Sequence, residues 1–310
     1  MTASPAGPPP GAENGRLGAS DLFMVLTTLV WGVNLSLIKI SLREMTPHAF
    51  NGVRLSVAAL LYGIVLVAGR KKAKPLGRDA WKILGLAVLG TTLYQWLFIQ
   101  GIEHATASTT SLILAMAPVY IAVLSSVLGQ ERIHWAAWIG IAVSVFGFYA
   151  VIAGPSLSFR LSPAELRGDL LLLAANLTWA VFTVLSRGVL KRVPPLRLAA
   201  LMAVPGTILY LPLAARDMAS QRYAGVSVGA WGGLLFSAAL AIFAGYIAWF
   251  FSLERVGNTK TAIYSTLSPV FGVLFAALFL AERLGPVQAV GALVILIGVY
   301  LTRSGDRLFR

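Results

Sequence analysis

Long apolar runs, separated by short polar gaps, cover most of the chain. Each run has about 18–22 residues, which is enough for an α-helix to cross roughly 30 Å of hydrocarbon. A helix is expected because it satisfies every backbone polar group within its own segment. The pattern predicts an all-α integral membrane protein with ten transmembrane helices, at 22–41, 48–69, 81–102, 107–128, 134–153, 169–188, 197–215, 230–251, 261–280 and 286–303.

One segment of the chain occurs twice. Residues 107–132 read ASTTSLILAMAPVYIAVLSSVLGQER, and residues 258–283 read NTKTAIYSTLSPVFGVLFAALFLAER. The two prolines, Pro118 and Pro269, are 151 residues apart (269 − 118), as are Glu131 and Glu282 (282 − 131). The same offset relates Glu103 to Glu254, Gly140 to Gly291, Gly147 to Gly298 and Tyr149 to Tyr300, and an offset of 148 relates Trp31 to Trp179, Lys39 to Arg187 and Pro47 to Pro195.

These matches predict two copies of one five-helix unit. Because five is odd, the second copy enters the membrane in the opposite direction, and inverted repeats of this kind are typical of secondary transporters. We expect a disordered cytoplasmic tail at 1–20, a first repeat at 21–153, a linker at 154–168, a second repeat at 169–303 and a cytoplasmic tail at 304–310.

Composition and charge fit a protein whose main partner is the lipid bilayer. The chain is 57% hydrophobic and 12% charged, against about 25% charged in soluble domains. With the N-terminus inside, loop lysines and arginines gather on the cytoplasmic side, where 70–78 reads RKKAKPLGR, so both termini are expected there. The net charge of +13 is thereby explained without a nucleic-acid partner. The polar start lacks the apolar core of a cleaved signal peptide, so the first span is expected to stay in the mature protein.

Polar and aromatic side chains inside the runs are candidates for substrate contact. Asn34, on nearly the same helix face as Trp31, can hydrogen-bond either a substrate or a neighbouring helix. Arg54 can neutralise a substrate carboxylate, reach the membrane interface, or pair with Glu44 or Glu103. The aromatic candidates can instead serve helix packing. The candidate substrate-binding residues are Trp31, Asn34, Arg54, Tyr94, Gln95, Phe98, Thr109, Trp179, Tyr246, Trp249, Lys260 and Tyr264.

Two kinds of residue bear on helix geometry. Pro118 and Pro269 each remove a backbone hydrogen bond, which predicts either a hinge or a static bend in the fourth and ninth spans. Small faces on the fifth and tenth spans, formed by Gly140, Gly147, Gly291 and Gly298, predict close packing within the chain or between protomers. A monomer and a homodimer both remain open.

Enzymatic motifs are almost absent. No cysteine is present, which excludes disulfides, thiolate metal sites and cysteine nucleophiles. Gly225–Gly229 fits G-x-S-x-G, but a hydrolase needs a strand–turn–helix elbow there, and this segment reads as a short loop. We expect no enzyme, no cofactor and no metal. Because no carboxylate lies near the centre of a run, the sequence favours facilitated diffusion and leaves coupling by another route open.

Several of these residues together resemble the EamA family of the drug/metabolite transporter superfamily. The resemblance rests on WGVN at 31–34, Arg54-Leu55, the proline-centred fourth and ninth spans, and their exits GQER and AER at 129–132 and 281–283. It covers about 21–303 and implies ten transmembrane helices in two inverted repeats, with export of amino acids or related metabolites through the bacterial inner membrane. Within that family, the chain is similar to bacterial aromatic amino-acid exporters.

The resemblance also implies where the substrate passes. In this family the first four helices of each half surround a central cavity, and the fifth and tenth lie at the periphery. Met202 stands where Arg54 does in the first half, and Phe182 where Asn34 does, so an asymmetric site is expected. The alternatives are a drug or other metabolite transporter of the same fold, and a membrane sensor or scaffold that transports nothing.

Overall fold

The computed structural model describes residues 19–69, 76–130, 135–153, 162–283 and 285–308, and within them it consists of helices and short loops, without strands. Seven helical segments there are long and apolar enough to cross a membrane. The all-α membrane class is therefore confirmed. The seven are Leu22–Ser41, Pro47–Gly69, Asp79–His104, Ala107–Val127, Pro163–Leu190, Pro195–Ser220 and Val228–Arg255, and shorter apolar helices cover Trp138–Gly147, Ser268–Leu280 and Ala289–Gly298.

The first half of the chain contains both continuous and interrupted helices. Its third and fourth apolar runs are each divided in two, the third by a π-helical segment and the fourth by a break before a proline. The elements are α1 (Ala19–Ser41), α2 (Pro47–Gly69), α3 (Asp79–Ala87), η2 (Val88–Leu93), α4 (Tyr94–His104), α5 (Ala107–Leu114), α6 (Ala117–Val127) and α7 (Trp135–Ala153).

The second half repeats this order of interruptions. A π-helical segment divides its third run, and a 3-10 segment precedes the proline of its fourth. In α11 the chain turns at Gly257, whose φ of 84° suits glycine because it has no Cβ. The elements are α8 (Pro163–Leu190), α9 (Pro195–Ser220), η3 (Tyr223–Gly225), α10 (Val228–Phe236), η4 (Ser237–Ala244), α11 (Gly245–Tyr264), η5 (Ser265–Leu267), α12 (Ser268–Leu280) and α13 (Pro286–Leu308).

Some boundaries differ from the sequence prediction. The expected linker at 154–168 is shorter, because α8 begins at Pro163 behind a capping box formed by Ser162 and Glu165. Helix α9 continues to Ser220, well beyond the predicted end at 215. Most of the expected N-terminal tail, 1–18, lies outside the described residues, and α13 includes 304–308 of the expected C-terminal tail.

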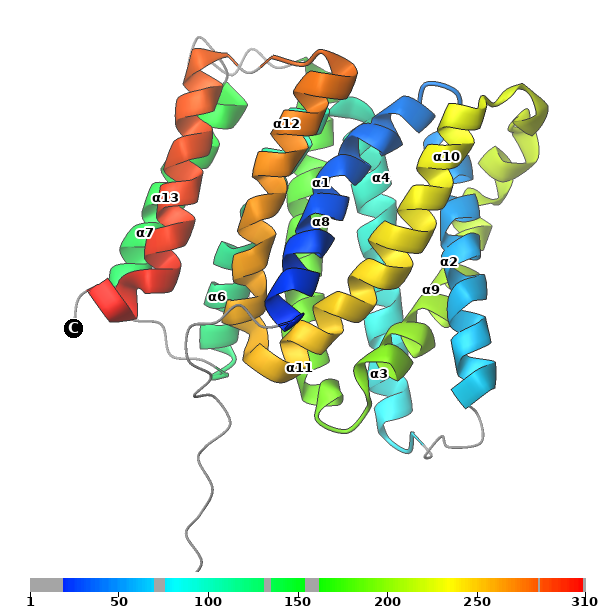
Figure 1. The fold of residues 1–310 in the computed structure, drawn as a ribbon, viewed down its shortest axis with the longest axis horizontal. Coiled ribbons are helices and arrows are strands. Elements are labelled where there is room, and N and C mark those ends of the chain that lie inside the picture. The colour runs from blue at the N-terminus through cyan, green and yellow to red at the C-terminus, as the bar shows by residue number, and fades with distance from the viewer. Residues whose placement is uncertain (1–18, 70–75, 131–134, 154–161, 284, 309–310) are drawn as a thin grey trace, which may run out of the picture.

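Helices α7 and α13 pack along each other at one edge of the bundle (Figure 1). Glycine makes this contact possible: a Cβ added to Gly147 would lie 2.7 Å from the backbone nitrogen of Ile295 and 2.8 Å from the carbonyl oxygen of Gly291. The small faces predicted on the fifth and tenth runs thus pack against each other within one chain.

The other elements pair in a matched way around the centre. Helix α1 packs against α12 and the α10–η4–α11 run, α8 packs against α6 and the η2–α4 run, and α2 packs against α9. The end of α1 lies beside the end of α4, since the Lys39 Nζ donates to the carbonyl oxygen of Glu103 at 3.2 Å. The start of α8 lies there too, since a Cβ on Gly168 would be 2.8 Å from the Cβ of His104. Helices α1 and α8 therefore run in opposite directions.

The outer surface of the bundle is apolar. Large hydrophobic side chains such as Leu60, Val67 and Phe146 are each more than two-thirds exposed. A water-soluble protein rarely exposes large contiguous apolar patches, whereas lipid contact makes such a surface favourable. Buried polar side chains lie instead inside the bundle, among them Asn51, Arg54, Gln95 and Asn176.

Candidate functional site

A cavity of about 100 Å³ lies at the centre of the bundle, between the two halves of the chain. It is lined from α1, α2, α4, α5, α6, α8, η4, α11, η5 and α12, and not from the peripheral helices α7 and α13. Eight of the twelve predicted substrate-binding residues line it, together with the predicted hinge residue Pro269. The eight are Trp31, Asn34, Arg54, Tyr94, Gln95, Phe98, Trp179 and Tyr246.

Three of the other four candidates do not line the cavity. Trp249 is buried behind it, with its ring 5.6 Å from that of Trp31. Thr109 lies in the first turn of α5, where its backbone nitrogen donates to the Thr106 hydroxyl at 3.0 Å. Tyr264 packs, half-buried, against the apolar core. The side chain of Lys260 lies outside the described residues.

Several polar residues at the cavity were not among the candidates predicted from the sequence. Asn176, Ser111, Ser265 and Ser268 all line it, but single serines and asparagines in an apolar run have no distinctive pattern. Asn176 did carry a signal, because it lies one helical turn before Trp179, whereas Asn34 lies about one turn after Trp31. In two helices that run in opposite directions, these positions fall on the same side of the tryptophans.

Arg54 is held by neutral oxygen atoms. Its guanidinium donates to the side chains of Asn51 and Gln95, both at 2.5 Å, and to the Ser237 hydroxyl at 2.9 Å. The residue is 1% exposed, and its Nε has no hydrogen-bond partner. Its cationic group also lies 5.4 Å from the ring centre of Phe50, a cation–π contact.

No acidic side chain among the described residues pairs with Arg54, and none of the cavity-lining residues is an aspartate or a glutamate. The two pairings considered from sequence are wrong. Glu44 instead binds the backbone nitrogen and hydroxyl of Ser227, and Glu103 lies 3.8 Å from His104. The third alternative, a reach to the membrane interface, is also wrong because Arg54 is buried. A buried cation without a counter-charge is costly, so an anionic group is favoured beside it.

Gln95 joins the two halves of the chain at this point. Its Oε1 accepts from Arg54, and its Nε2 donates to the Tyr246 hydroxyl at 3.0 Å. These partners fix the orientation of the amide, because only an oxygen can accept from a guanidinium. Arg54 on α2, Gln95 on α4 and Tyr246 on α11 thus form one hydrogen-bonded chain beside the cavity.

Aromatic rings form a cluster at the cavity. The ring of Trp179 lies 6.1 Å from that of Trp31 in an edge-to-face arrangement, 5.1 Å from Tyr94 and 5.4 Å from both Tyr246 and Trp249. Such offset and edge contacts stabilise aromatic clusters beyond the area they bury. The cluster therefore gives the cavity an aromatic lining beside the polar side chains, and Tyr246 belongs to both.

The π-helical segment η4 supplies backbone acceptors to this region. The indole Nε1 of Trp31 donates to the carbonyl oxygen of Ala241 at 2.9 Å, and the Tyr62 hydroxyl donates to that of Phe243, also at 2.9 Å. A π-turn changes the usual backbone pairing and frequently occurs at functional sites. Here it turns carbonyl oxygens toward side chains from α1 and α2.

Both predicted hinge prolines lie at helix breaks. Helix α5 ends at Leu114 and α6 begins at Ala117, with Pro118 in its first turn. The 3-10 segment η5 likewise precedes α12, which has Pro269 in its first turn. Each proline therefore starts a new helix and does not bend a continuous one.

Carboxylates connect the loops at the end of the bundle that holds residues 42–46. Glu44 accepts hydrogen bonds from the Ser227 backbone nitrogen at 2.6 Å and hydroxyl at 2.7 Å, and these bonds lower the pKa of the Glu44 carboxyl. Ser227 also caps α10 by accepting from the backbone nitrogen of Ala230. The serine of the G-x-S-x-G sequence is therefore a helix cap with a glutamate partner.

Glu282 makes a similar contact at the same end. Its two carboxylate oxygens accept from the backbone nitrogens of Ala107 at 3.0 Å and Ser108 at 2.9 Å, at the start of α5. A carboxylate is favourable there because the helix N-terminus is partially positive. The corresponding Glu131 of the first half lies outside the described residues.

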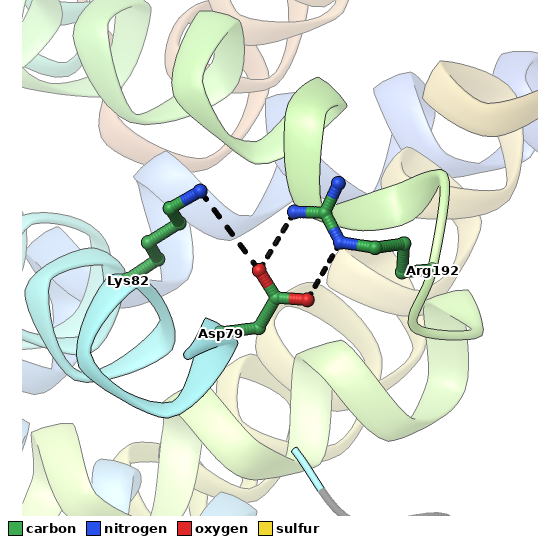
Figure 2. Close-up of polar contacts among 3 residues, drawn as sticks. All are labelled: Asp79, Lys82 and Arg192. Carbon is green, nitrogen blue, oxygen red and sulfur yellow. Dashed lines mark hydrogen bonds and ion pairs between the residues drawn. The ribbon is translucent and has the colours of Figure 1, made fainter. Parts of the chain in front are cut away.

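The opposite end of the bundle has an ion pair between loops. Figure 2 shows Arg192, which follows α8, beside Asp79 at the start of α3. The Nε and Nη2 of Arg192 each donate to a carboxylate oxygen of Asp79 at 2.6 Å, and the Nζ of Lys82 lies 4.0 Å from that carboxylate. Asp79 raises the pKa of the Arg192 guanidinium. Each end thus has a contact between the loop after α1 or α8 and an element of the other half.

Comparison with known proteins places these features in context. The model of the EamA-like transporter family matches residues 18–153 and 166–304. An uncharacterized transporter of Archaeoglobus fulgidus is 25% identical over 90% of this chain and 97% of its own length. A probable amino-acid metabolite efflux pump of Salmonella typhimurium is 26% identical over 92% of this chain and 95% of its own.

Two further comparisons agree with these. A probable terminal-alkyne amino-acid exporter of Streptantibioticus cattleyicolor is 26% identical over 90% of this chain and 91% of its own. A solved crystal structure with 17% sequence identity superposes with a TM-score of 0.71, covering 95% of this chain and 99% of the other. At that identity the superposition shows a common fold and nothing more.

Proposed function

The chain belongs to the EamA-like transporter family, and on this premise we propose that it exports amino acids and related small metabolites across the bacterial inner membrane by alternating access. Family membership makes it a transporter and not an enzyme, so a hydrolase built on Gly225–Gly229 is excluded. Two relatives named for amino-acid export support the substrate class. Amino acids with neutral side chains, including aromatic ones, suit the tryptophan-containing lining of the cavity.

We infer ten membrane-spanning segments in two inverted repeats, 21–153 and 169–303, with both termini in the cytoplasm. The opposite directions of α1 and α8 support this arrangement. The matched positions of η2 and η4, and of the breaks before Pro118 and Pro269, support it as well. Two inverted halves can exchange conformations, which would open the central site to one side and then to the other.

The observation that carries the proposal is the central cavity, which is lined by an arginine without an acidic partner and by an aromatic cluster. Its volume of about 100 Å³ is below the roughly 300–1,000 Å³ of pockets for drug-sized ligands. Substrate entry would therefore require the helices around the cavity to separate. The breaks in the fourth and ninth runs are the positions where we expect that movement.

Efflux from proteoliposomes tests the proposal. Vesicles that contain the purified chain are loaded with labelled amino acids, and efflux is compared with that from protein-free vesicles, with and without a pH gradient. Efflux of neutral amino acids above the protein-free rate is expected. Efflux of other metabolites alone would replace the amino-acid assignment, and no efflux of any solute in a broad panel would contradict a transport role.

A further inference from the structure

The unpaired polar atoms of the cavity-lining residues are of two kinds, a donor on Arg54 and acceptors on two asparagines. The donor side is Arg54, a buried cation whose Nε remains unpaired and whose charge is not neutralised by any described acid. A carboxylate satisfies such a group best, because it carries the opposite charge and accepts more than one N–H. This side alone would suit any small carboxylic acid.

The acceptor side contains Asn176. The residue is 1% exposed and lines the cavity, and its Nδ2 donates to the carbonyl oxygen of Ile113 at 2.9 Å. Because a carbonyl can only accept, the amide must turn its nitrogen toward Ile113. The Oδ1 is then left without a partner, and a buried acceptor without a donor costs free energy.

Asn34 adds a second acceptor. It is 6% exposed, it lines the same cavity, and its Oδ1 also has no partner. The two asparagines come from different halves of the chain, yet both lie on the same side of the tryptophan pair, because α1 and α8 run in opposite directions. Ser111, nearby on α5, contributes a third buried oxygen without a partner.

We propose, resting on the proposed function, that the site binds zwitterionic α-amino acids by both poles. The carboxylate pairs with Arg54, and the ammonium group donates to the Oδ1 atoms of Asn34 and Asn176. An ammonium group is the natural partner for several neutral oxygens that line one cavity, since it offers three donors. The face of Trp179 stabilises the same cation, and the substrate side chain packs among the aromatic rings.

The test uses two matched ligand series. Phenylalanine is compared with 3-phenylpropionate, which lacks the amine, with phenethylamine, which lacks the carboxylate, and with 3-phenyllactate, which carries a hydroxyl in place of the amine. Leucine, 4-methylpentanoate and isopentylamine form the second series. Binding is measured by tryptophan fluorescence of the full chain in lipid nanodiscs, because Trp31 and Trp179 line the cavity.

Each amino acid is expected to bind at least about tenfold more tightly than either analogue that lacks one pole. The reason is that a hydrogen bond to a charged group changes the Kd by more than about tenfold. Asn176→Leu and Asn34→Leu should each weaken amino-acid binding about tenfold and leave 3-phenylpropionate binding unchanged. Thr183→Val is the matched control for Asn176→Leu, because Thr183 is a buried residue of the same helix, α8, and does not line the cavity.

The alternative outcomes are distinct. If 3-phenylpropionate binds as tightly as phenylalanine, or if both ligands lose affinity equally in Asn176→Leu, the ammonium site is wrong while the transporter proposal stands. If no member of either series binds, the amino-acid assignment falls with it. The wild-type ligand comparison decides the matter even if one variant fails to fold.

Discussion

At the scale of single residues, Arg54 is the feature that defines the site. It is buried in the bundle, hydrogen-bonded to Asn51, Gln95 and Ser237, and has no acidic partner among the described residues. A structural arginine of this depth would normally be paired. We therefore expect a substrate anion to bind beside its charge in the cavity.

The prediction for Arg54 separates charge from geometry. Arg54→Gln should reduce amino-acid efflux about 10–100-fold, since hydrogen bonds to charged groups contribute about 1.5–3 kcal/mol. Arg54→Lys keeps the charge but not the planar fork, so it should retain intermediate activity. Efflux from proteoliposomes is the measurement, and wild-type rates in Arg54→Gln at equal protein content would show that the charge is not used.

Glu44 provides a residue-scale test of the loop contacts. Hydrogen bonds from Ser227 lower its pKa in the folded protein, so the contact stabilises the fold above the ordinary glutamate pKa, which is 4.5. That stabilisation should be lost as the pH falls below this value through the lowered pKa. Thermal unfolding in detergent should therefore show a higher melting temperature for wild type than for Glu44→Gln at pH 7, by a few degrees at most.

The difference in melting temperature between wild type and Glu44→Gln should vanish at low pH. Ser227→Ala removes the hydroxyl hydrogen bond to Glu44, and with it the cap on Ala230, but keeps the backbone bond. Its effect and that of Glu44→Gln should therefore be less than additive. Additive effects, or a difference that persists through acid, would show that the Glu44 contact does not account for the stabilisation.

At the scale of elements, the interrupted helices are the parts of the molecule suited to movement. Proline removes a backbone donor, and the breaks before Pro118 and Pro269 leave the fourth and ninth runs in two pieces each. Both breaks adjoin the cavity, through Leu114 and Ala117 on one side and Ser265 and Pro269 on the other. Movement of either half-helix would change the shape of the site.

We predict that Pro118→Ala and Pro269→Ala lower the efflux rate severalfold without reducing membrane insertion, because alanine restores a backbone donor and favours a continuous helix. Pro205→Ala is the matched control, since α9 continues as a helix through Pro205. Insertion is measured as folded protein in the membrane fraction and rate as initial efflux. Efflux rates equal to wild type in both Pro118→Ala and Pro269→Ala would contradict the hinge hypothesis.

At the scale of the whole molecule, the arrangement of the two halves decides what the site can do. The cavity receives residues from both halves, and the contacts of α1 mirror those of α8. The mirrored contacts place Trp31 beside Trp179 and put Asn34 and Asn176 on the same side of that pair. No described residue of α7 or α13 lines the cavity.

The inverted arrangement predicts a labelling pattern. The chain has no cysteine, so single cysteines can be introduced at Arg43 and Lys191, two exposed positions that correspond at the offset of 148. A membrane-impermeant thiol reagent should label Arg43→Cys in intact cells and Lys191→Cys only after permeabilisation. Labelling of both from the same side would contradict inverted repeats, and the cysteine-free parent reports background.

The sequence by itself determined the class and much of the site. Membrane helices can be recognised in the sequence because a span of the bilayer needs a long uncharged run. The repeat can be recognised because its Pro, Trp and Glu residues recur at a fixed offset. Eight of the twelve proposed contacts line the cavity, since polar or aromatic residues such as Arg54 and Trp31 are costly in lipid and so stand out against their surroundings.

Only the tertiary structure decided how these residues act. Asn176 and the serines were not singled out, because an isolated small polar residue in an apolar run can as easily bond its own helix. The partners of Arg54 come from three separate elements. Helical periodicity predicts neither their distances from Arg54 nor the burial of its side chain. Trp249 satisfied the same sequence criteria as Trp31 yet lies behind the cavity, because the face that a residue presents depends on which helix packs beside it.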